Sequence, residues 1–494
     1  MVSIFWSVGG VAVAGPARLP SPGGSVVSYP DRDDCSRFQV SMRTTTTGST
    51  DAEFHGVSVQ GEERRGTVGD QENRDWIAPR PHGRRRFLKL AGAGIPAVAG
   101  VSGAPMAQGA TQPRTRPSGD VRRVVVFHLD SLHHEAPERL GLVNFQRIAE
   151  RGTRVDKALT IAPWHPTVSG FWPLSTTSFP NPTTFAGSVF LRPWQKQRYL
   201  QHSFAGYTAH IANSQAYRSL NPGFDFTRLD DEDSDEDNVR LGLRQLSEHR
   251  HLTFMRLLLQ DTNAVSQQVA NAPAGEPWAR DIYGKGSPYP QVVRRADALL
   301  GTFLDGLRRM GIADDTLLVV LADGQSRYGW HPVQAEDSWR LPLVFAGPGV
   351  ARGRVVDYAE NIDIAPTIAA LAGVPAPNEN GGSGRVLDEV RTANVSRPDV
   401  PRRIERINRQ IVEYLRLEGW MRVHARSYPY VDARLMAAHN GLLTEAQFWS
   451  LDRIDEWPQA GSLDRMLQDN QHALAFLHEA LRESGAPPLP AAQG

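Results

Sequence analysis

The stretch Thr316–Val350 constrains the fold of this chain more than any other. An apolar, β-branched run at 316–322 ends abruptly at Asp323, and a polar loop with His331 leads to a second apolar run, LPLVFAGPG. Short apolar runs that end in turns are typical of buried strands in a parallel sheet. Because ligands bind such sheets where strands end and loops begin, the carboxylate of Asp323 is placed for chemistry.

Strand and helix patterns alternate along the rest of the central region. Strands are predicted at 121–130, 207–213 and 251–260, and amphipathic helices at 142–151 and 291–310. This alternation predicts an α/β fold with a mainly parallel sheet sandwiched by helices. Residues 391–494 are polar, Arg-rich and helical in pattern, and we expect them to form a C-terminal helical extension.

The first part of the chain is expected to lie outside this domain. Residues 84–89 read Arg-Arg-Arg-Phe-Leu-Lys, which resembles a twin-arginine export signal, and the weakly apolar run that follows is too short to span a bilayer. We therefore expect the export machinery to recognise 84–109 and to leave a periplasmic or secreted chain without a stable membrane span. Residues 1–83 lack periodicity and are predicted to be disordered or to reflect a misplaced start.

Charge and cysteine content exclude several functions. The 54 basic and 54 acidic residues give a formal net charge of zero, which does not favour nucleic-acid binding. The one cysteine, Cys35, precedes the predicted signal, so the mature chain would hold neither a disulfide nor a thiol nucleophile. The acidic run at 230–237 lacks the glycine and terminal glutamate of an EF-hand, and we interpret it as a solvated loop.

Three segments in order carry a resemblance to a known family. They are VVVFHLDSL, the helix and strand unit that ends in LLVVLADG, and SWRLPLVFAGPGVARGRVVDYAENIDIAPTIAALAGVPAP. Together they resemble the sulfatase-like branch of the alkaline phosphatase superfamily over residues 121–390. The resemblance implies an alkaline-phosphatase-like sheet, a site for a divalent metal (zinc, calcium or manganese) at neighbouring strand ends, and a small-molecule, glycan or lipid ester as substrate.

Four metal ligands follow from this resemblance: Asp130, Asp261, Asp323 and His331. Asp130 matches the first metal carboxylate of the family, and Asp323 matches the aspartate of its Asp-His-Gly motif. Asp261 ends the strand that supplies an aspartate in metal-dependent phosphatase relatives. His331 stands where many relatives carry a histidine. Hard carboxylate oxygens and an imidazole nitrogen suit a divalent ion.

The nucleophile is expected in the segment that begins at Thr160. The Cys-x-Pro-x-Arg signature of formylglycine sulfatases is absent, and Ile161 stands at the aligned position, so phosphate esters are favoured over sulfate esters. Thr160 is one residue out of register with the threonine of the Thr-x-Pro pattern in phosphodiesterase relatives, and Thr167 is a second candidate. His165 is a further catalytic candidate, because it lies in the loop expected to carry the nucleophile.

Several positions depart from the family pattern. Gly324 stands where the motif has a histidine, Ser131 replaces the second aspartate of sulfatases, and no histidine follows Asp261. Two hypotheses from different classes therefore stay open. One is an exported metal-dependent hydrolase with a degenerate metal site, and the other is a catalytically inactive protein of the same fold that acts by binding.

The remaining polar residues near these motifs allow two interpretations each. His128, His133 and His134 flank Asp130. They are either replacement nitrogen ligands, or His128 is a packed strand residue and His133 and His134 form an exposed turn. Asp363 precedes Ile-Ala-Pro-Thr and is interpreted as a helix cap rather than a catalytic residue.

Overall fold

The computed structural model describes residues 114–160, 198–377, 384–391, 402–424, 428–442 and 462–491, apart from Ser118 and Val333. All of them lie in one compact unit, Val101–Gly494. The predicted export signal at 84–109 and the candidates His165 and Thr167 lie outside the described residues. None of the described helices has the length and hydropathy needed to cross a membrane.

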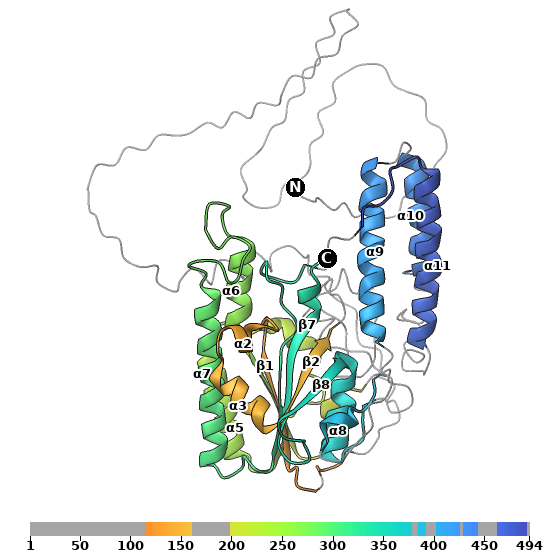
Figure 1. The fold of residues 1–494 in the computed structure, drawn as a ribbon. Coiled ribbons are helices and arrows are strands. Elements are labelled where there is room, and N and C mark those ends of the chain that lie inside the picture. Colours follow the sequence, from red (N-terminus) through yellow and green to blue (C-terminus); the bar gives the residue numbers. More distant parts are fainter. Residues whose placement is uncertain are drawn as a thin grey trace, which may run out of the picture. The chain divides into compact units, whose positions relative to one another are not determined.

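Eight strands form the central sheet (Figure 1). They are β1 (Arg123–Leu129), β2 (Thr153–Leu159), β3 (Tyr207–Ala212), β4 (Phe226–Leu229), β5 (Leu252–Leu259), β6 (Thr316–Leu321), β7 (Arg340–Ala346) and β8 (Arg354–Glu360). Their order is β4-β3-β5-β1-β6-β7-β2-β8, and neighbours are parallel except where β7 pairs with β6 and with β2. The predicted mainly parallel α/β sheet is confirmed.

Helices connect these strands. They are α2 (Ala136–Arg139), α3 (Val143–Arg151), α5 (Asp235–Glu248), α6 (Asp261–Ala270), α7 (Tyr289–Arg309) and α8 (Ile364–Ala372). Short 3-10 helices are η2 (Leu200–Ser203), η3 (Gln215–Leu220), η4 (Glu336–Trp339), η5 (Asn361–Asp363) and η6 (Asp388–Val390). The strands and helices predicted at 121–130, 142–151, 207–213, 251–260, 291–310 and 316–322 are β1, α3, β3, β5, α7 and β6.

Two apolar cores cover the two faces of the sheet, because side chains alternate between the faces along each strand. In β1, Val124 and Val126 belong to the core that contains α8 residues such as Ile368, whereas Val125 and Phe127 belong to the core with residues of α3, α5, α6 and α7. The strands are therefore buried on both sides, and this explains their continuous apolar runs.

The interpretation of 230–237 as a solvated loop is wrong for part of the run. Ser234 caps α5 through a capping box with Asp237, and Asp235 in the first turn is only 2% exposed. Acidic residues are favourable in the first turn of a helix, because the backbone N–H groups there carry partial positive charge. The second half of the run is therefore a helix start.

The described C-terminal residues form three helices, α9 (Arg403–His424), α10 (Tyr428–Leu442) and α11 (Ser462–Glu483). These helices share an apolar cluster that includes Leu417, Leu435 and Leu477. Two hydrogen bonds join α9 to strand ends: Ile404 N donates to Glu360 Oε1 (2.7 Å), and Asn408 Nδ2 donates to the carbonyl oxygen of Thr160 (2.9 Å).

Candidate metal centre

Two parallel strands bring the carboxylates Asp130 and Asp323 together. Asp130 follows β1 directly, and Asp323 follows the adjacent strand β6 after one intervening residue. The backbone N–H of Asp130 donates to Leu259 O (3.0 Å) at the end of β5, so the pairing of the strands fixes this position. A carboxylate at a strand end therefore has a defined direction before any ligand arrives.

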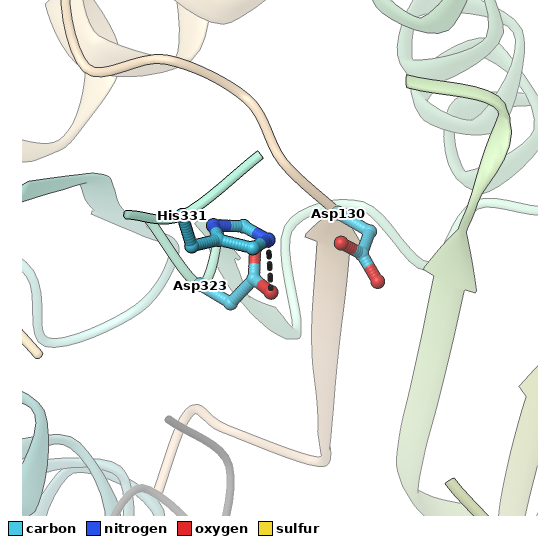
Figure 2. Close-up of side chains that lie close together, drawn as sticks. All are labelled: Asp130, Asp323 and His331. Carbon is cyan, nitrogen blue, oxygen red and sulfur yellow. Dashed lines mark ion pairs between the residues drawn. The ribbon is translucent and has the colours of Figure 1, made fainter. Parts of the chain in front are cut away.

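His331 completes a group of three ligand-type side chains with Asp130 and Asp323 (Figure 2). One ligand atom from each of the three lies within 4.8 Å of the others. His331 Nε2 is 4.0 Å from Asp323 Oδ2. All three residues are buried: Asp130 is 0% exposed, Asp323 1% and His331 4%. Three of the four predicted metal-binding residues thus lie together.

Ser131 connects the members of this group. Its N–H donates to Asp323 Oδ1 (2.8 Å), and its hydroxyl donates to Asp130 Oδ1 (3.1 Å) and lies 3.3 Å from His331 Nε2. Ser131 has a φ of 58°, in the left-handed region that non-glycine residues rarely adopt. The strained backbone at Ser131 is maintained because its hydrogen bonds and the packing of the strand ends leave it no other conformation.

Burial makes the two carboxylates unfavourable as a pair of anions. It raises the pKa of Asp130 to about 6, although hydrogen bonds from Tyr217 and Ser131 act in the opposite direction. Burial and the adjacent charge of Asp130 raise the pKa of Asp323 well above its ordinary value. A cation between the two would favour the charged form of both, because an opposite charge at close range lowers a carboxyl pKa.

The donor set fits a divalent cation. Asp323 Oδ2 is buried and has no hydrogen-bond partner among the described residues. A buried charged oxygen in that state is costly unless a cation or a donor satisfies it. Two carboxylates and one imidazole are donors that zinc and manganese accept, and the carboxylate oxygens also suit calcium.

Asp261, the fourth predicted ligand, is not in this group. It begins α6, and its backbone N–H donates to Asp235 Oδ1 (3.1 Å). Asp235 also accepts from Asn213 Nδ2 and from Gln260 N (both 2.8 Å). Burial and the charge of Asp261 raise the pKa of Asp235 to about 7. The structure thus places Asp261 beside a second acidic residue rather than beside Asp130.

Thr160 lies at the end of β2, next to the residue that follows Asp323. Its N–H donates to Trp339 O (2.7 Å), and its hydroxyl oxygen accepts from Asn361 Nδ2 (3.0 Å). Gly324 has a φ of 102°, and a Cβ added there would be 3.4 Å from the methyl group of Thr160 but only 2.2 Å from Ser338 O. The family histidine that Gly324 replaces would therefore not fit this backbone.

The three histidines near Asp130 are outside the ligand group. His128 is fully buried within β1, and burial lowers its pKa well below the ordinary value. His133 lies beside Asp337, with 3.5 Å between Nε2 and Oδ2, and its ring is 4.5 Å from that of His134. Burial lowers the pKa of His134 to about 3. His128 is thus packed in the core, as one of the two interpretations had it. The interpretation of His133 and His134 as an exposed turn is wrong, because their side chains are 2% and 10% exposed.

Sequence reasoning missed two residues at the centre, Tyr217 and Arg256. The Tyr217 hydroxyl donates to Asp130 Oδ2, and Arg256 Cζ lies 5.4 Å from the centroid of the Tyr217 ring. Arg256 is the single charged residue in β5, LTFMRLLL, and this was a usable sign that it has a specific role. Tyr217 lies in the short helix η3, where no periodic pattern marks it.

Comparison with known families gives one family match. Residues 182–374, less than half of the chain, match the family described as Sulfatase. This segment includes Asp323 and His331 but begins after Asp130. The resemblance to sulfatases is confirmed over this segment.

Similar proteins match over short stretches. The chain is 34% identical to choline-sulfatase of Rhizobium meliloti over 125 residues, which are 24% of this chain and 22% of that protein. It is 31% identical to arylsulfatase A of Homo sapiens over 109 residues, 19% of this chain and 21% of that protein. The chain thus spans about a fifth of the length of these curated relatives.

Solved structures with a similar fold include two bacterial proteins. A protein in the alkaline phosphatase superfamily from Vibrio parahaemolyticus has a TM-score of 0.43 and 22% identity, and the match covers 59% of this chain and 73% of that one. The phosphonate monoester hydrolase of Silicibacter pomeroyi has a TM-score of 0.42 and 16% identity, with 56% and 78% covered.

Proposed function

We propose that this chain, whose residues 182–374 match the sulfatase family, is a metal-dependent hydrolase of phosphate esters, with sulfate esters as a second substrate class. The observation that carries the proposal is the group of Asp130, Asp323 and His331, in which Asp323 Oδ2 has no hydrogen-bond partner among the described residues. A group of this kind is costly to bury without a cation. The substrate is a small-molecule, glycan or lipid ester.

Four residues would form and support the metal site. Asp130, Asp323 and His331 hold the ion, and Ser131 keeps both carboxylates in place through its N–H and its hydroxyl. A bound divalent ion would neutralise the anionic oxygens of the ester and lower the pKa of a hydroxyl nucleophile.

Thr160 is the proposed nucleophile. Its hydroxyl oxygen would form a bond to phosphorus, the ester alcohol would leave with a proton, and water would then release phosphate from the threonine. Asn361 donates to this oxygen, so the side chain is oriented before substrate binds. The absence of cysteine from 36–494 removes the usual precursor of formylglycine, which supports phosphate over sulfate.

A non-catalytic binding protein of the same fold is the second candidate. The observation in its favour is Gly324, where the left-handed backbone and the nearby Ser338 carbonyl leave no room for the family histidine. A site with fewer ligands binds its ion more weakly, because affinity depends on the number of ligands.

Metal content and turnover separate the two candidates. We expect the purified full-length chain, after dialysis, to retain one or two divalent ions and to hydrolyse aryl phosphate or phosphonate esters in a metal-dependent way. Bound ion without turnover on phosphate, phosphonate or sulfate esters would support the binding protein. Failure to bind zinc, calcium or manganese would rule out the hydrolase.

Export through the twin-arginine machinery is also part of the proposal, and a periplasmic or secreted location follows from it. The support is the Arg-Arg-x-Phe-Leu-Lys pattern at 84–89 and the short apolar run behind it. N-terminal sequencing of the protein from the natural host checks it: a mature chain that begins near residue 110 is expected, and an intact 84–109 segment contradicts export.

A further inference from the structure

We propose that Tyr217 and Arg256 are positioning residues of the metal centre: Tyr217 fixes the orientation of Asp130, and Arg256 holds Tyr217. This inference rests on the proposed function, because it concerns the same three ligands. Both residues are buried and lie within the segment that matches the sulfatase family, but neither belongs to the three segments that carry the family resemblance.

Tyr217 and Ser131 hydrogen-bond to the two carboxylate oxygens of Asp130. The Tyr217 hydroxyl donates to Asp130 Oδ2, and the Ser131 hydroxyl donates to Asp130 Oδ1 at 3.1 Å. Each oxygen of the carboxylate thus accepts one hydrogen bond from a neutral hydroxyl. An ionised carboxylate has about four lone-pair positions, so lone pairs remain for an ion while rotation of the group is restricted.

The hydrogen bond between Tyr217 and Asp130 is buried. Tyr217 is 1% exposed and Asp130 0% exposed, so water does not compete for the hydrogen bond. The hydroxyl belongs to η3, which follows β3, whereas Asp130 follows β1. The hydrogen bond therefore ties the metal carboxylate to a turn that comes from a different part of the sheet.

Arg256 lies beside Tyr217. It belongs to β5, between β3 and β1, in register with His210 on one side and Val126 on the other. Its Cζ is 5.4 Å from the centroid of the Tyr217 ring, within the range of a cation–π contact. Arg256 is 4% exposed, so its charge acts on Tyr217, Asp130 and Asp323 through the protein interior.

Groups behind a metal ligand matter because they set its direction and donor strength. Changing such a partner typically weakens metal binding by 10- to 100-fold, even though it never touches the ion. The ring of Tyr217 also fills space, so loss of packing has to be separated from loss of the hydroxyl. Tyr217→Phe does this, because it keeps the ring beside Arg256 and removes only the oxygen.

The molecule provides a matched control. Tyr358 is likewise buried, and its hydroxyl donates to another buried carboxylate, Glu360 Oε1, at 2.8 Å. Tyr358→Phe therefore removes the same kind of hydrogen bond, but one that involves none of the three ligands. Both variants are expected to lose a similar amount of thermal stability without metal.

The experiment is calorimetric titration of the full-length metal-free chain with Mn²⁺. We expect Tyr217→Phe to raise the Kd for Mn²⁺ by about 10- to 100-fold, whereas Tyr358→Phe leaves it within about twofold. An unchanged Kd for Tyr217→Phe overturns the inference and leaves the metal centre intact. If the unmodified chain binds no Mn²⁺, zinc or calcium, the proposed function fails as well.

A second variant tests the role of Arg256. Arg256→Lys keeps a charge but loses the planar guanidinium over the ring, and we expect it to raise the Kd for Mn²⁺ severalfold. In the Tyr217→Phe background it should have little further effect, since lysine keeps the charge and the guanidinium orients Asp130 through the hydroxyl that this background lacks. Independent, additive effects would show that Arg256 does not act through Tyr217.

Discussion

Two pairs of buried carboxylates lie where strands of the sheet end, and they differ in what their oxygens contact. Asp130 and Asp323 form the candidate metal centre, while Glu360 and Asp363 lie at the end of β8 and the start of α8. Both pairs are nearly inaccessible: Glu360 and Asp363 are each 3% exposed, against 0% and 1% for Asp130 and Asp323.

Hydrogen-bond donors satisfy the second pair, and three of the four are backbone N–H groups. Glu360 Oε1 accepts from Ile404 N (2.7 Å) and from the Tyr358 hydroxyl (2.8 Å). Asp363 Oδ2 accepts from Glu360 N, and Asp363 Oδ1 accepts from Arg385 N, both at 2.9 Å. These contacts join α9 and the segment at 384–391 to the sheet, so the pair has a structural role.

A raised pKa does not separate the two pairs. Burial and the charge of Asp363 raise the pKa of Glu360 to about 7, and burial raises the pKa of Asp363 to about 6, the same value as for Asp130. What differs is Asp323 Oδ2, which has no hydrogen-bond partner among the described residues. This oxygen of Asp323, rather than the raised pKa values, therefore distinguishes the candidate ligand pair.

Replacing one carboxylate in each pair gives the largest expected contrast. Asp323→Asn should weaken Mn²⁺ binding by more than about 100-fold, because it replaces a metal ligand. Substitution of a residue that only hydrogen-bonds to a ligand already weakens metal binding by roughly 10- to 100-fold. Without metal its stability should change little, because the amide is neutral and its oxygen can still accept the hydrogen bond from Ser131 N. Calorimetric titration and chemical denaturation measure the two effects.

Asp363→Asn should show the reverse pattern. Its amide would direct an N–H group at Glu360 N or Arg385 N, so the free energy of unfolding should fall by about 1–3 kcal/mol. Mn²⁺ affinity should not change. If Asp363→Asn weakened Mn²⁺ binding as much as Asp323→Asn, the distinction between a ligand pair and a structural pair would be wrong.

The pH dependence of stability provides the next contrast. A folded-state pKa of about 6 for Asp130, against 3.8 unfolded, means that the metal-free folded chain holds a proton that the unfolded chain releases. This contribution to stability is complete below pH 3.8 and is lost as the pH rises through about 6. A shift of about two pKa units corresponds to about 3 kcal/mol.

Saturating Mn²⁺ should remove this share of the pH dependence, because the ion takes the place of the proton. Metal affinity should accordingly rise between pH 5 and pH 7, and urea denaturation with and without Mn²⁺ measures both effects. The contributions of Glu360 and Asp363 have the same sign and should persist with metal, since neither residue belongs to the proposed ligand group. A metal-independent pH profile would contradict the assignment of Asp130.

The sequence was sufficient to predict the sheet and three of the residues that meet at its edge. Strands buried on both faces read as continuous apolar runs, and Asp323 could be recognised as a carboxylate at a strand end. The family resemblance implied that Asp130, Asp323 and His331 are ligands of one metal site. Asp261 also ends a strand, but α6 begins there at once, and the sequence does not show that its N–H binds Asp235.

Other features depend on tertiary contacts that leave no local pattern. Tyr217 lies in a short 3-10 helix between β3 and β4, and its partner Asp130 is far away in the sequence. Asp363 was interpreted as a helix cap, but its side chain makes no cap hydrogen bond to α8 and instead closes a capping box with Glu360 around η5. Local sequence indicates capping ability and does not select the helix.

Two glycines with positive φ provide the smallest contrast, between the centre and an open turn. Gly324 has a φ of 102°, and a Cβ there would meet Ser338 O at 2.2 Å, whereas Gly141 has a φ of 62° and nothing within 4 Å. Gly141→Ala should cost about 1 kcal/mol, from the left-handed conformation alone. Gly324→Ala should cost about 3 kcal/mol and weaken Mn²⁺ binding, because the backbone next to Asp323 has to move. Equal losses of stability in denaturation experiments would mean that the turn at Gly324 adapts freely, and the family histidine could then be restored there.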